Sequence, residues 1–251
     1  MPSGILLTFD DGLIDHYKYV LPILKERWLW GTFFICSWPL ENKKKVLNVH
    51  KIHYLLGKYN AKDLCYVLDK LLLQTDAKEL FEKIKNVWAY KNYSIDNYSL
   101  KIKHLNYLND FYLQDYLLNS LLEHFSESPE LIWDKIYMNI DQLKELRNIW
   151  NIIGWHSKTH RLLAKLQAHE IKEEVGKSNF ELTNQLWLTI NSFCYPYGVD
   201  DSYNEAIINE LIEQKVEYAF CVNPRDIISS DSLYELPRYD CTLFKYWLPR
   251  L

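Results

Sequence analysis

The stretch that decides the fold is Thr8-Phe9-Asp10-Asp11-Gly12, which follows the short apolar run Ile5-Leu6-Leu7. The apolar run predicts a buried strand, so the two adjacent aspartates lie where that strand ends. Gly12 permits a sharp turn that a side chain would hinder. Neighbouring carboxylates repel each other, so a site that keeps both usually holds a metal ion, or keeps one acid as a base beside another that is a ligand. A solvated Asp-Asp-Gly turn is the alternative, and this stretch alone does not separate the two.

A second polar cluster, residues 154–160, follows another apolar run at 149–153. In it His156 and His160 are four residues apart, which places two imidazoles on one side of a helical turn, or across a tight loop, where both reach one cation. A lone histidine pair with this spacing is more often surface decoration, but here polar residues again follow an apolar strand. Two histidines and one carboxylate form a three-ligand metal site with open positions, which indicates catalysis rather than structural support.

With both clusters in this order, the chain resembles the polysaccharide deacetylase family, the chitin-deacetylase-like carbohydrate esterases. The family's first motif, Thr-Phe-Asp-Asp-Gly, is matched in full at 8–12, and its second, His-Ser/Thr-x-x-His, is matched at 156–160. The resemblance implies that Asp10 is the general base. It also implies that a metal ion, usually zinc, is held by Asp11, His156 and His160.

A third segment, Pro196-Tyr197-Gly198, is similar to the family motif whose backbone N–H helps to bind the oxyanion and whose aromatic ring walls the site. The resemblance makes Tyr197 the matching residue; a plain Pro-Tyr-Gly turn is the alternative. The family's arginine, two residues before the proline, is Cys194 in this chain. Because that arginine orients the base, we hypothesise that Arg238, at the end of a late strand, replaces it from another direction.

The general acid is a second departure from the family pattern. The family supplies a histidine in Leu-x-His near the C-terminus, and no histidine follows His169 here. His16, just past the first motif, and Asp240 are candidates for protonating the leaving amine. Alternatively, the base returns its own proton.

The organisation of the chain predicts an α/β fold. Strands alternating with helices imply a mainly parallel sheet, and the resemblance implies a distorted (β/α) barrel with the site at the C-terminal strand ends. We expect residues 1–40 and 131–251 to form the barrel and residues 41–130 to form a long helical insertion. Two apolar stripes at helical spacing indicate helices there: Leu64, Val67, Leu68, Leu71 and Leu72, and Leu105, Leu108, Tyr112, Tyr116 and Leu117. The insertion is a lid, a recognition element or an oligomer surface, or it has no contact with substrate.

Composition, charge and cysteine content indicate which class of partner and which cellular location to expect. The chain has 251 residues, 48% of them hydrophobic, enough for a large core, and its net charge of −4 without a long basic run argues against nucleic acid. Five scattered cysteines without a Cys-x-x-Cys pair indicate reduced, buried thiols. There is no signal-like segment and no 18-residue apolar span. We therefore expect no transmembrane segment, and a cytoplasmic location or a peripheral one at the inner membrane.

The resemblance implies a metal-dependent hydrolase that removes an N-acetyl group from an amino sugar in cell-surface polysaccharide or lipopolysaccharide biosynthesis, O-antigen included. A cytoplasmic location implies an N-acetylated substrate that is nucleotide- or lipid-linked. A deformylase or other deacylase on the same scaffold is one alternative. A non-catalytic carbohydrate-binding protein is another, because two catalytic groups are missing. Two histidines and a carboxylate also suit iron(II) in an oxygenase, although such enzymes usually have a different fold.

Overall fold

The computed structural model describes residues 4–41, 44–75, 79 and 96–244. The chain divides into two compact units, one formed by residues 1–40 and 136–251 and the other by residues 41–135. The division falls close to the expected limits of the insertion. That the two units are separate domains stays a prediction.

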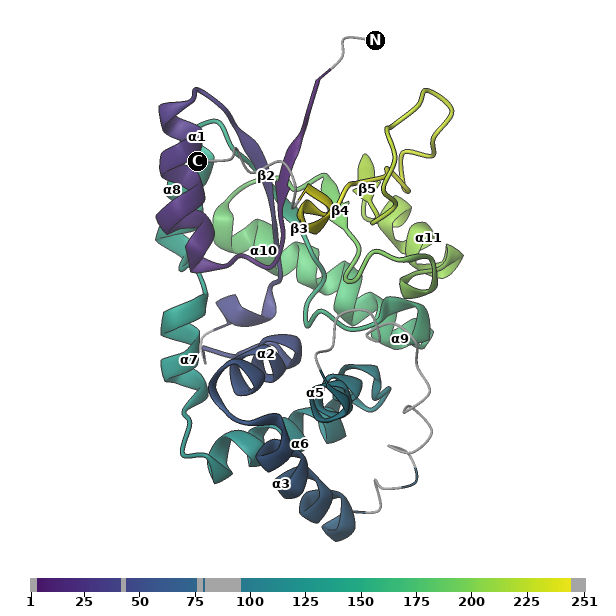
Figure 1. The fold of residues 1–251 in the computed structure, drawn as a ribbon. Helices are drawn as coiled ribbons and strands as arrows, with labels where there is room; N and C mark the ends of the chain where they lie inside the picture. Colours follow the sequence, from purple (N-terminus) through teal and green to yellow (C-terminus); the bar gives the residue numbers. More distant parts are fainter. Residues whose placement is uncertain (1–3, 42–43, 76–78, 80–95, 245–251) are drawn as a thin grey trace. The chain divides into compact units, whose positions relative to one another are not determined.

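The first unit is built on a parallel five-stranded sheet in the order β1-β2-β3-β4-β5 (Figure 1). The strands are β1 (Leu7–Phe9), β2 (Gly31–Ile35), β3 (Ile152–Trp155), β4 (Ser192–Cys194) and β5 (Tyr218–Phe220). Each strand pairs with the one that precedes it in this order, which is the connectivity of a (β/α) barrel. The expected fold class is confirmed as a parallel half-barrel.

Two sequence expectations about strands are wrong in detail. The first strand begins at Leu7, where it pairs with Gly31, so Ile5 is 91% and Leu6 is 40% exposed. An edge strand has one strand neighbour only, so the residues that precede its first pair are left uncovered. The expected late strand before Arg238 is reduced to a single bridge between Phe220 and Leu236.

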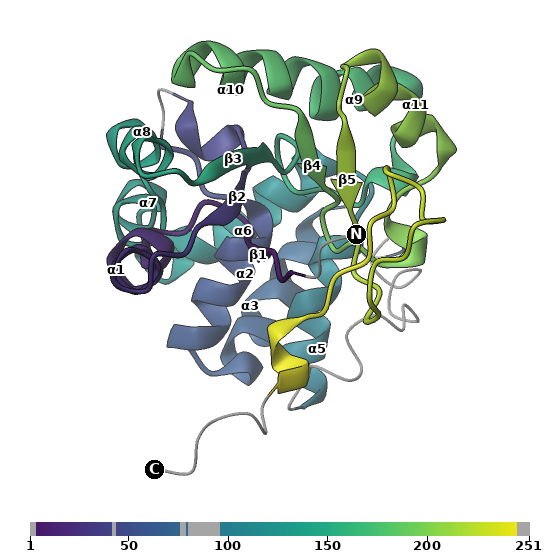
Figure 2. The same ribbon diagram turned by 90° about the horizontal axis from the view of Figure 1, so that it is seen from above.

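Helices cover one face of this sheet (Figure 2). They are α1 (Leu21–Glu26), α8 (Ile140–Asn148), α9 (Ala168–Ile171), α10 (Ser178–Leu186) and α11 (Glu205–Glu213). π-Helical turns at His16–Val20 and Lys172–Lys177 lead into α1 and α10. Short 3₁₀ turns lie at Trp38–Leu40, Leu163–Lys165, Asp200–Ser202 and Cys241–Phe244. Asn139 caps α8 in a capping box with Gln142.

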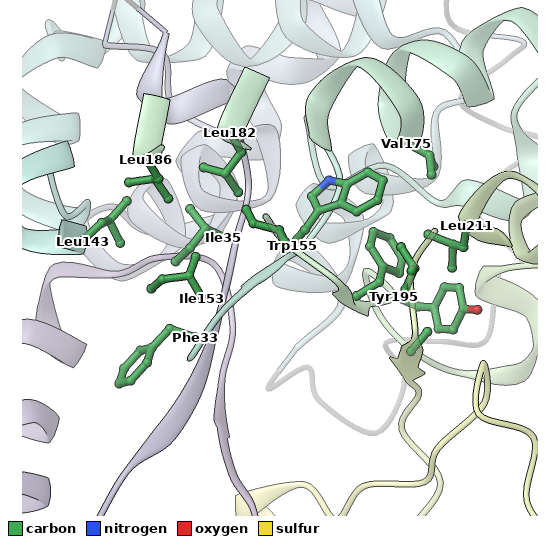
Figure 3. Packing of buried hydrophobic residues seen from close by; sticks show 14 of the residues in the cluster. Phe33, Ile35, Leu143, Ile153, Trp155, Val175, Leu182, Leu186, Tyr195 and Leu211 are labelled. Carbon is green, nitrogen blue, oxygen red and sulfur yellow. The ribbon is translucent and has the colours of Figure 1, made fainter. Parts of the chain in front are cut away.

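Alternation along the strands separates two faces of the sheet. Side chains on the outer face pack with the helices in the main core, which Figure 3 shows in part: Phe33, Ile35, Ile153, Trp155, Tyr195, Leu143, Val175, Leu182, Leu186 and Leu211. The alternate positions form a smaller inner cluster of Phe34, Cys194 and Phe220. Asp10 and His156 lie just beyond the ends of β1 and β3, at positions in step with the inner face. The two-residue period of a strand therefore directs both side chains toward the inside of the half-barrel.

The packing of this inner face requires glycine at position 154. A Cβ atom there would lie 2.4 Å from the Phe34 ring and 2.9 Å from Ser192 Oγ. Real Cβ atoms do not approach that closely, so glycine lets the large Phe34 side chain fill the inner cluster.

The second unit is helical. Its helices are α2 (Asn48–Lys58), α3 (Ala61–Gln74), α5 (Asn97–Lys103), α6 (Phe111–His124) and α7 (Pro129–Ile136), with a 3₁₀ turn at His104–Tyr107. The stripe predicted on α3 is buried at Leu64, Val67, Leu68 and Leu72. The second stripe is wrong at Tyr112 and Tyr116, which are 84% and 52% exposed. None of the helices in the described residues has both the length and the apolarity needed to cross a bilayer.

Candidate active site

The two aspartates leave β1 in different directions. Asp11 and Gly12 both have left-handed backbones, with φ of 73° and 71°, so the chain turns sharply once the strand has ended. The Gly12 carbonyl accepts a hydrogen bond of 3.0 Å from the Met138 N–H, which anchors the turn. A Cβ at residue 12 would press on Ile35 at 3.3 Å. The turn thus carries Asp11 away from the course of Asp10 and toward the histidines.

His156 is held by bonds on two sides. Its backbone N–H donates to the Ile35 carbonyl at 3.0 Å, and its ring Nδ1 lies 2.7 Å from the Cys194 carbonyl oxygen. A carbonyl oxygen only accepts, so Nδ1 carries the proton and Nε2 keeps its lone pair. That Nε2 lies 3.5 Å from Asp11 Oδ1, and the ring is buried. His156 therefore presents a metal-binding nitrogen to Asp11.

His160 completes the group from a tight loop, one of the two geometries that the four-residue spacing allowed. Its Nε2 lies 3.6 Å from Asp11 Oδ1. Ser157 and His160 have left-handed backbones, with φ of 64° and 59°, and Ser157 Oγ accepts a hydrogen bond from the His160 N–H. Non-glycine residues in this region cost free energy, and they concentrate where a function needs them.

Glu174 holds this loop from the π-helical turn and was missed in the sequence. Its carboxylate accepts hydrogen bonds from the Thr159 N–H, at 2.9 Å, and from the Thr159 hydroxyl. Its carbonyl accepts one from the Lys158 N–H at 3.0 Å. Burial raises the pKa of Glu174, while the two bonds from Thr159 oppose that rise. Nothing in the residue order signals this role, because it arises from the packing of Glu174 under the loop.

The donor set fits a tetrahedral cation. The ligand atoms of Asp11, His156 and His160 lie within 4.8 Å of one another. Two ligands about 2.0–2.1 Å from a tetrahedral zinc ion are about 3.4 Å apart, which is close to the 3.5 Å and 3.6 Å found here. The hydrogen bond from His156 Nδ1 is the outer contact that orients a histidine ligand. Two imidazoles and one carboxylate also leave a coordination position open.

Asp10 has a separate set of partners. Arg238 donates from Nη1 to Asp10 Oδ1 at 3.0 Å and from Nη2 to Oδ2 at 2.9 Å, and Nη1 also donates to Thr8 Oγ1 at 3.0 Å. Burial alone would raise the pKa of Asp10, but the charge of Arg238 and its hydrogen bonds to the carboxylate oppose this and hold that pKa below its usual range. Asp10 is therefore an oriented carboxylate at neutral pH.

Cys194 occupies the place of the family's arginine and contacts the same pair. Its Sγ lies 2.8 Å from Arg238 Nη2 and 3.6 Å from Asp10 Oδ2. The side chain is fully buried, and burial raises its pKa well above the usual value. The thiol is a small, neutral neighbour that leaves room for a guanidinium from elsewhere in the chain.

Tyr197 lies against the histidines. Its ring centroid is 4.9 Å from that of His160, and the two rings meet edge to face. Tyr197 and Gly198 have φ of 64° and 68°, and the Gly198 carbonyl accepts a bond of 2.7 Å from the Val222 N–H. The structure thus brings Tyr197 to the side of the metal-binding group.

His16 is placed differently. Its ring lies 5.5 Å from the ring of Phe9 and 5.9 Å from that of Phe33, whose side chains face the helices. Burial lowers the pKa of His16, and the charges of Asp11 and Asp10 oppose that fall. His16 therefore packs against two side chains of the outer face.

A hollow of about 660 Å³ adjoins Asp10 and Arg238. It extends along β1 and is mostly apolar, with Ile5, Phe220 and Phe244 among its lining residues. The three candidate metal ligands do not line it, so the hollow begins on the far side of the Asp10–Arg238 pair.

Comparisons with known proteins agree with this geometry. The sequence model of the polysaccharide deacetylase family matches residues 2–219. Three solved structures share the fold of this chain; each aligns with 95% of this chain at 15% sequence identity. They are the Streptococcus pyogenes deacetylase PplD in complex with acetate (TM-score 0.54), IcaB from Ammonifex degensii (0.53) and the deacetylase domain of BpsB from Bordetella bronchiseptica (0.55). This chain spans 66%, 68% and 71% of those chains, respectively. No curated protein sequence gives a significant match.

Proposed function

Because the chain belongs to the polysaccharide deacetylase family, we propose that it is a metal-dependent hydrolase that removes an N-acetyl group from an amino sugar. The observation that carries the proposal is the division of labour between neighbouring carboxylates. Asp11 faces two imidazole nitrogens, whereas Asp10 is bound on both oxygens by Arg238. We therefore assign Asp11 the role of a metal ligand and Asp10 that of an ionised base, the two roles that metal-assisted amide hydrolysis requires.

The metal would be held by Asp11, His156 and His160. When bound, zinc would lower the pKa of a water molecule and polarise the acyl oxygen. Asp10 would accept a proton from the attacking water as the oxygen of that water bonds to the acyl carbon. Arg238 keeps the Asp10 carboxylate oriented and ionised. The Tyr197 backbone N–H donates to the developing oxyanion, an interaction that contributes about 3 kcal/mol in enzymes of this kind.

Collapse of the adduct breaks the C–N bond and needs a proton on the nitrogen. In our proposal Asp10 returns to the nitrogen the proton that it took, so a neutral amine and acetic acid leave. Proton exchange with water then gives ammonium and acetate. We assign His16 no part in this step, because its ring packs against Phe9 and Phe33. Asp240 lies two residues from Arg238 and is exposed, and it stays the other candidate acid.

The substrate follows from the family and from the sequence. The family, and the fold shared with the deacetylase PplD and the deacetylase domain of BpsB, support an N-acetylated sugar as the substrate. We propose a nucleotide- or lipid-linked amino sugar of a surface polysaccharide or lipopolysaccharide pathway, O-antigen included, and a cytoplasmic or peripheral inner-membrane location. A non-catalytic sugar-binding role is the second candidate, and the lack of any histidine after His169 favours it.

The test is acyl release from a panel. Zinc-loaded protein is incubated with nucleotide-linked, lipid-linked and oligomeric N-acetylated and N-formylated amino sugars, and acetate and formate are measured. We expect acetate release that Asp10→Asn abolishes and that the exposed Asp15→Asn retains. Formate release without acetate would identify a deformylase. Zinc and sugar binding without release from any substrate would contradict the hydrolase and identify the binding protein.

A further inference from the structure

Three tryptophans share one end of the first unit. Trp28, Trp150 and Trp187 are 94%, 88% and 83% exposed. They follow α1, α8 and α10 and precede β2, β3 and β4, three strands that are neighbours in the parallel sheet (Figures 1 and 2). The three loops therefore lie side by side at the N-terminal ends of the strands. We call these loops, residues 25–30, 144–151 and 183–190, the tryptophan face.

The backbone makes tryptophan a costly choice at these positions. All three residues have a left-handed backbone conformation, with φ of 54°, 67° and 54°. Each lies just after a helix, where glycine is preferred because it has no Cβ. The corresponding residue after α11 is Lys215, with φ of 60°. An indole there strains the backbone and is not buried, so neither turn geometry nor core packing explains it.

The surroundings of the tryptophans are apolar and basic. Leu29 and Trp30 in the first loop are each 49% exposed. The three loops contain four cationic residues, Lys25, Arg27, Lys144 and Arg147, against two acidic ones, in a chain of net charge −4. One of the acids, Glu145, accepts hydrogen bonds from Tyr17 and Lys25. Local positive charge thus accompanies the exposed indoles.

Arg147 and Trp187 also share a hollow. They line an open depression of about 700 Å³ with Thr183, Asn184 and Thr189. Arg147 forms no ion pair with any residue that the structure describes. A guanidinium, an amide and two hydroxyls beside an indole are donors suited to a phosphate oxygen next to apolar chains.

We propose that the tryptophan face docks on the surface of a bilayer that contains anionic lipid. Tryptophan favours the membrane–water interface, where its ring is desolvated and its N–H stays hydrogen-bonded. Cationic residues add attraction to lipid phosphates, and the two contributions together give reversible binding without a membrane span. Asp10 and His156 follow the opposite ends of the strands. Docking would therefore direct the catalytic end of the sheet away from the lipid surface.

The test is co-sedimentation of the full chain with vesicles, first of phosphatidylcholine alone and then with about 30% phosphatidylglycerol. We expect binding that increases with the anionic lipid and decreases with salt, with a blue shift of tryptophan emission. The variant Trp28→Gly/Trp150→Gly/Trp187→Gly should bind about tenfold more weakly. Its melting temperature should not fall, because glycine relieves the left-handed backbone.

Two further variants make the test specific. Phe180→Ala removes another exposed aromatic from α10, 66% exposed and outside the tryptophan face, and should bind like the wild type. Arg27→Gln/Arg147→Gln should lose the preference for anionic vesicles. Absence of binding to both vesicle types would overturn the proposal, as would equal binding by the triple glycine variant. Two other results would also overturn it if vesicles are not bound. One is a concentration-dependent dimer that the triple glycine variant abolishes, and the other is binding to an N-acetylglucosamine polymer that the same variant abolishes.

Discussion

Arg238 binds both carboxylate oxygens of Asp10, at 3.0 Å and 2.9 Å, although 228 residues separate them in the chain. The contact orients the Asp10 carboxylate and lowers its pKa, and we propose that it replaces the arginine that the family places two residues before Pro196. The same guanidinium fills the space that Cys194 leaves. In our proposal, the arginine that orients the base thus comes from the other end of the barrel unit.

Removing this guanidinium should reduce turnover without removing the metal. We expect Arg238→Ala to lower kcat/KM for the best substrate by about 10- to 100-fold, because Asp10 loses its orientation and its charge partner. Arg238→Lys should recover only part of the rate, because an ammonium cannot bind both oxygens in a fork. Steady-state kinetics with zinc content measured in parallel checks this. Unchanged kcat/KM in Arg238→Ala would refute the role that we assign.

Zinc should stabilise the protein through the three proposed ligands. Binding to the folded state alone adds about 2.7 kcal/mol to the free energy of unfolding when free zinc is one hundred times Kd. We expect a chelator to lower the melting temperature and added zinc to restore it. His160→Ala and Asp11→Asn should abolish the response, whereas Asp15→Asn should keep it. Full zinc occupancy in both ligand variants would show that the cation lies elsewhere.

Glu174 should act on metal affinity through the loop that it supports. In Glu174→Ala the Thr159 N–H and hydroxyl lose their acceptor, so we expect zinc affinity to fall by about 10- to 100-fold. Glu174→Gln keeps one acceptor oxygen and should be intermediate. The d–d spectrum of the cobalt-substituted protein reports the ligand geometry, and a global loss of stability alone would not alter it. An unaltered affinity and spectrum in Glu174→Ala would restrict Glu174 to a packing role.

Gly154→Ala should destabilise the first unit. The added methyl would meet the Phe34 ring at 2.4 Å, so a large buried side chain must move. Overpacking of this kind costs about 1–3 kcal/mol. Denaturant unfolding gives the change, and Gly57→Ala is the control, because a Cβ at Gly57 has no atom within 4 Å. Equal stability of the two variants would mean that Phe34 shifts freely.

Glu127 should make the helical unit sensitive to acid. It accepts hydrogen bonds from Tyr54, Lys58 and Tyr59. Burial would raise its pKa, but these bonds and the Lys58 charge lower it to about 2 from the ordinary 4.5. A lowered folded-state pKa gives stability that is present above pH 4.5 and is lost as the pH falls toward 2. Across this pH window the free energy of unfolding should change less with pH for Glu127→Gln than for the wild type. An identical pH slope for the two proteins would contradict this.

Local sequence predicted the placement of a side chain well where that placement depends only on the two-residue period of a strand and on where the strand ends. Asp10 and His156 follow apolar strands on the inner face, and the spacing of His156 and His160 left two geometries, of which the tight loop is found. The same reasoning failed at Ile5, because burial of an edge strand depends on where its partner begins, and at Tyr112, because helical spacing does not say which stripe is covered.

The sequence by itself determined the resemblance to the family, the mainly parallel sheet and the identity of the residues that follow the strand ends. These depend on short-range patterns, which a chain carries whether or not it is folded. Only the tertiary structure decided that Arg238 reaches Asp10, that His16 packs among phenylalanines, that Glu174 supports the histidine loop and that three tryptophans share one face. Each is a meeting of distant segments, and its geometry is fixed by packing of the whole sheet rather than by neighbours along the chain.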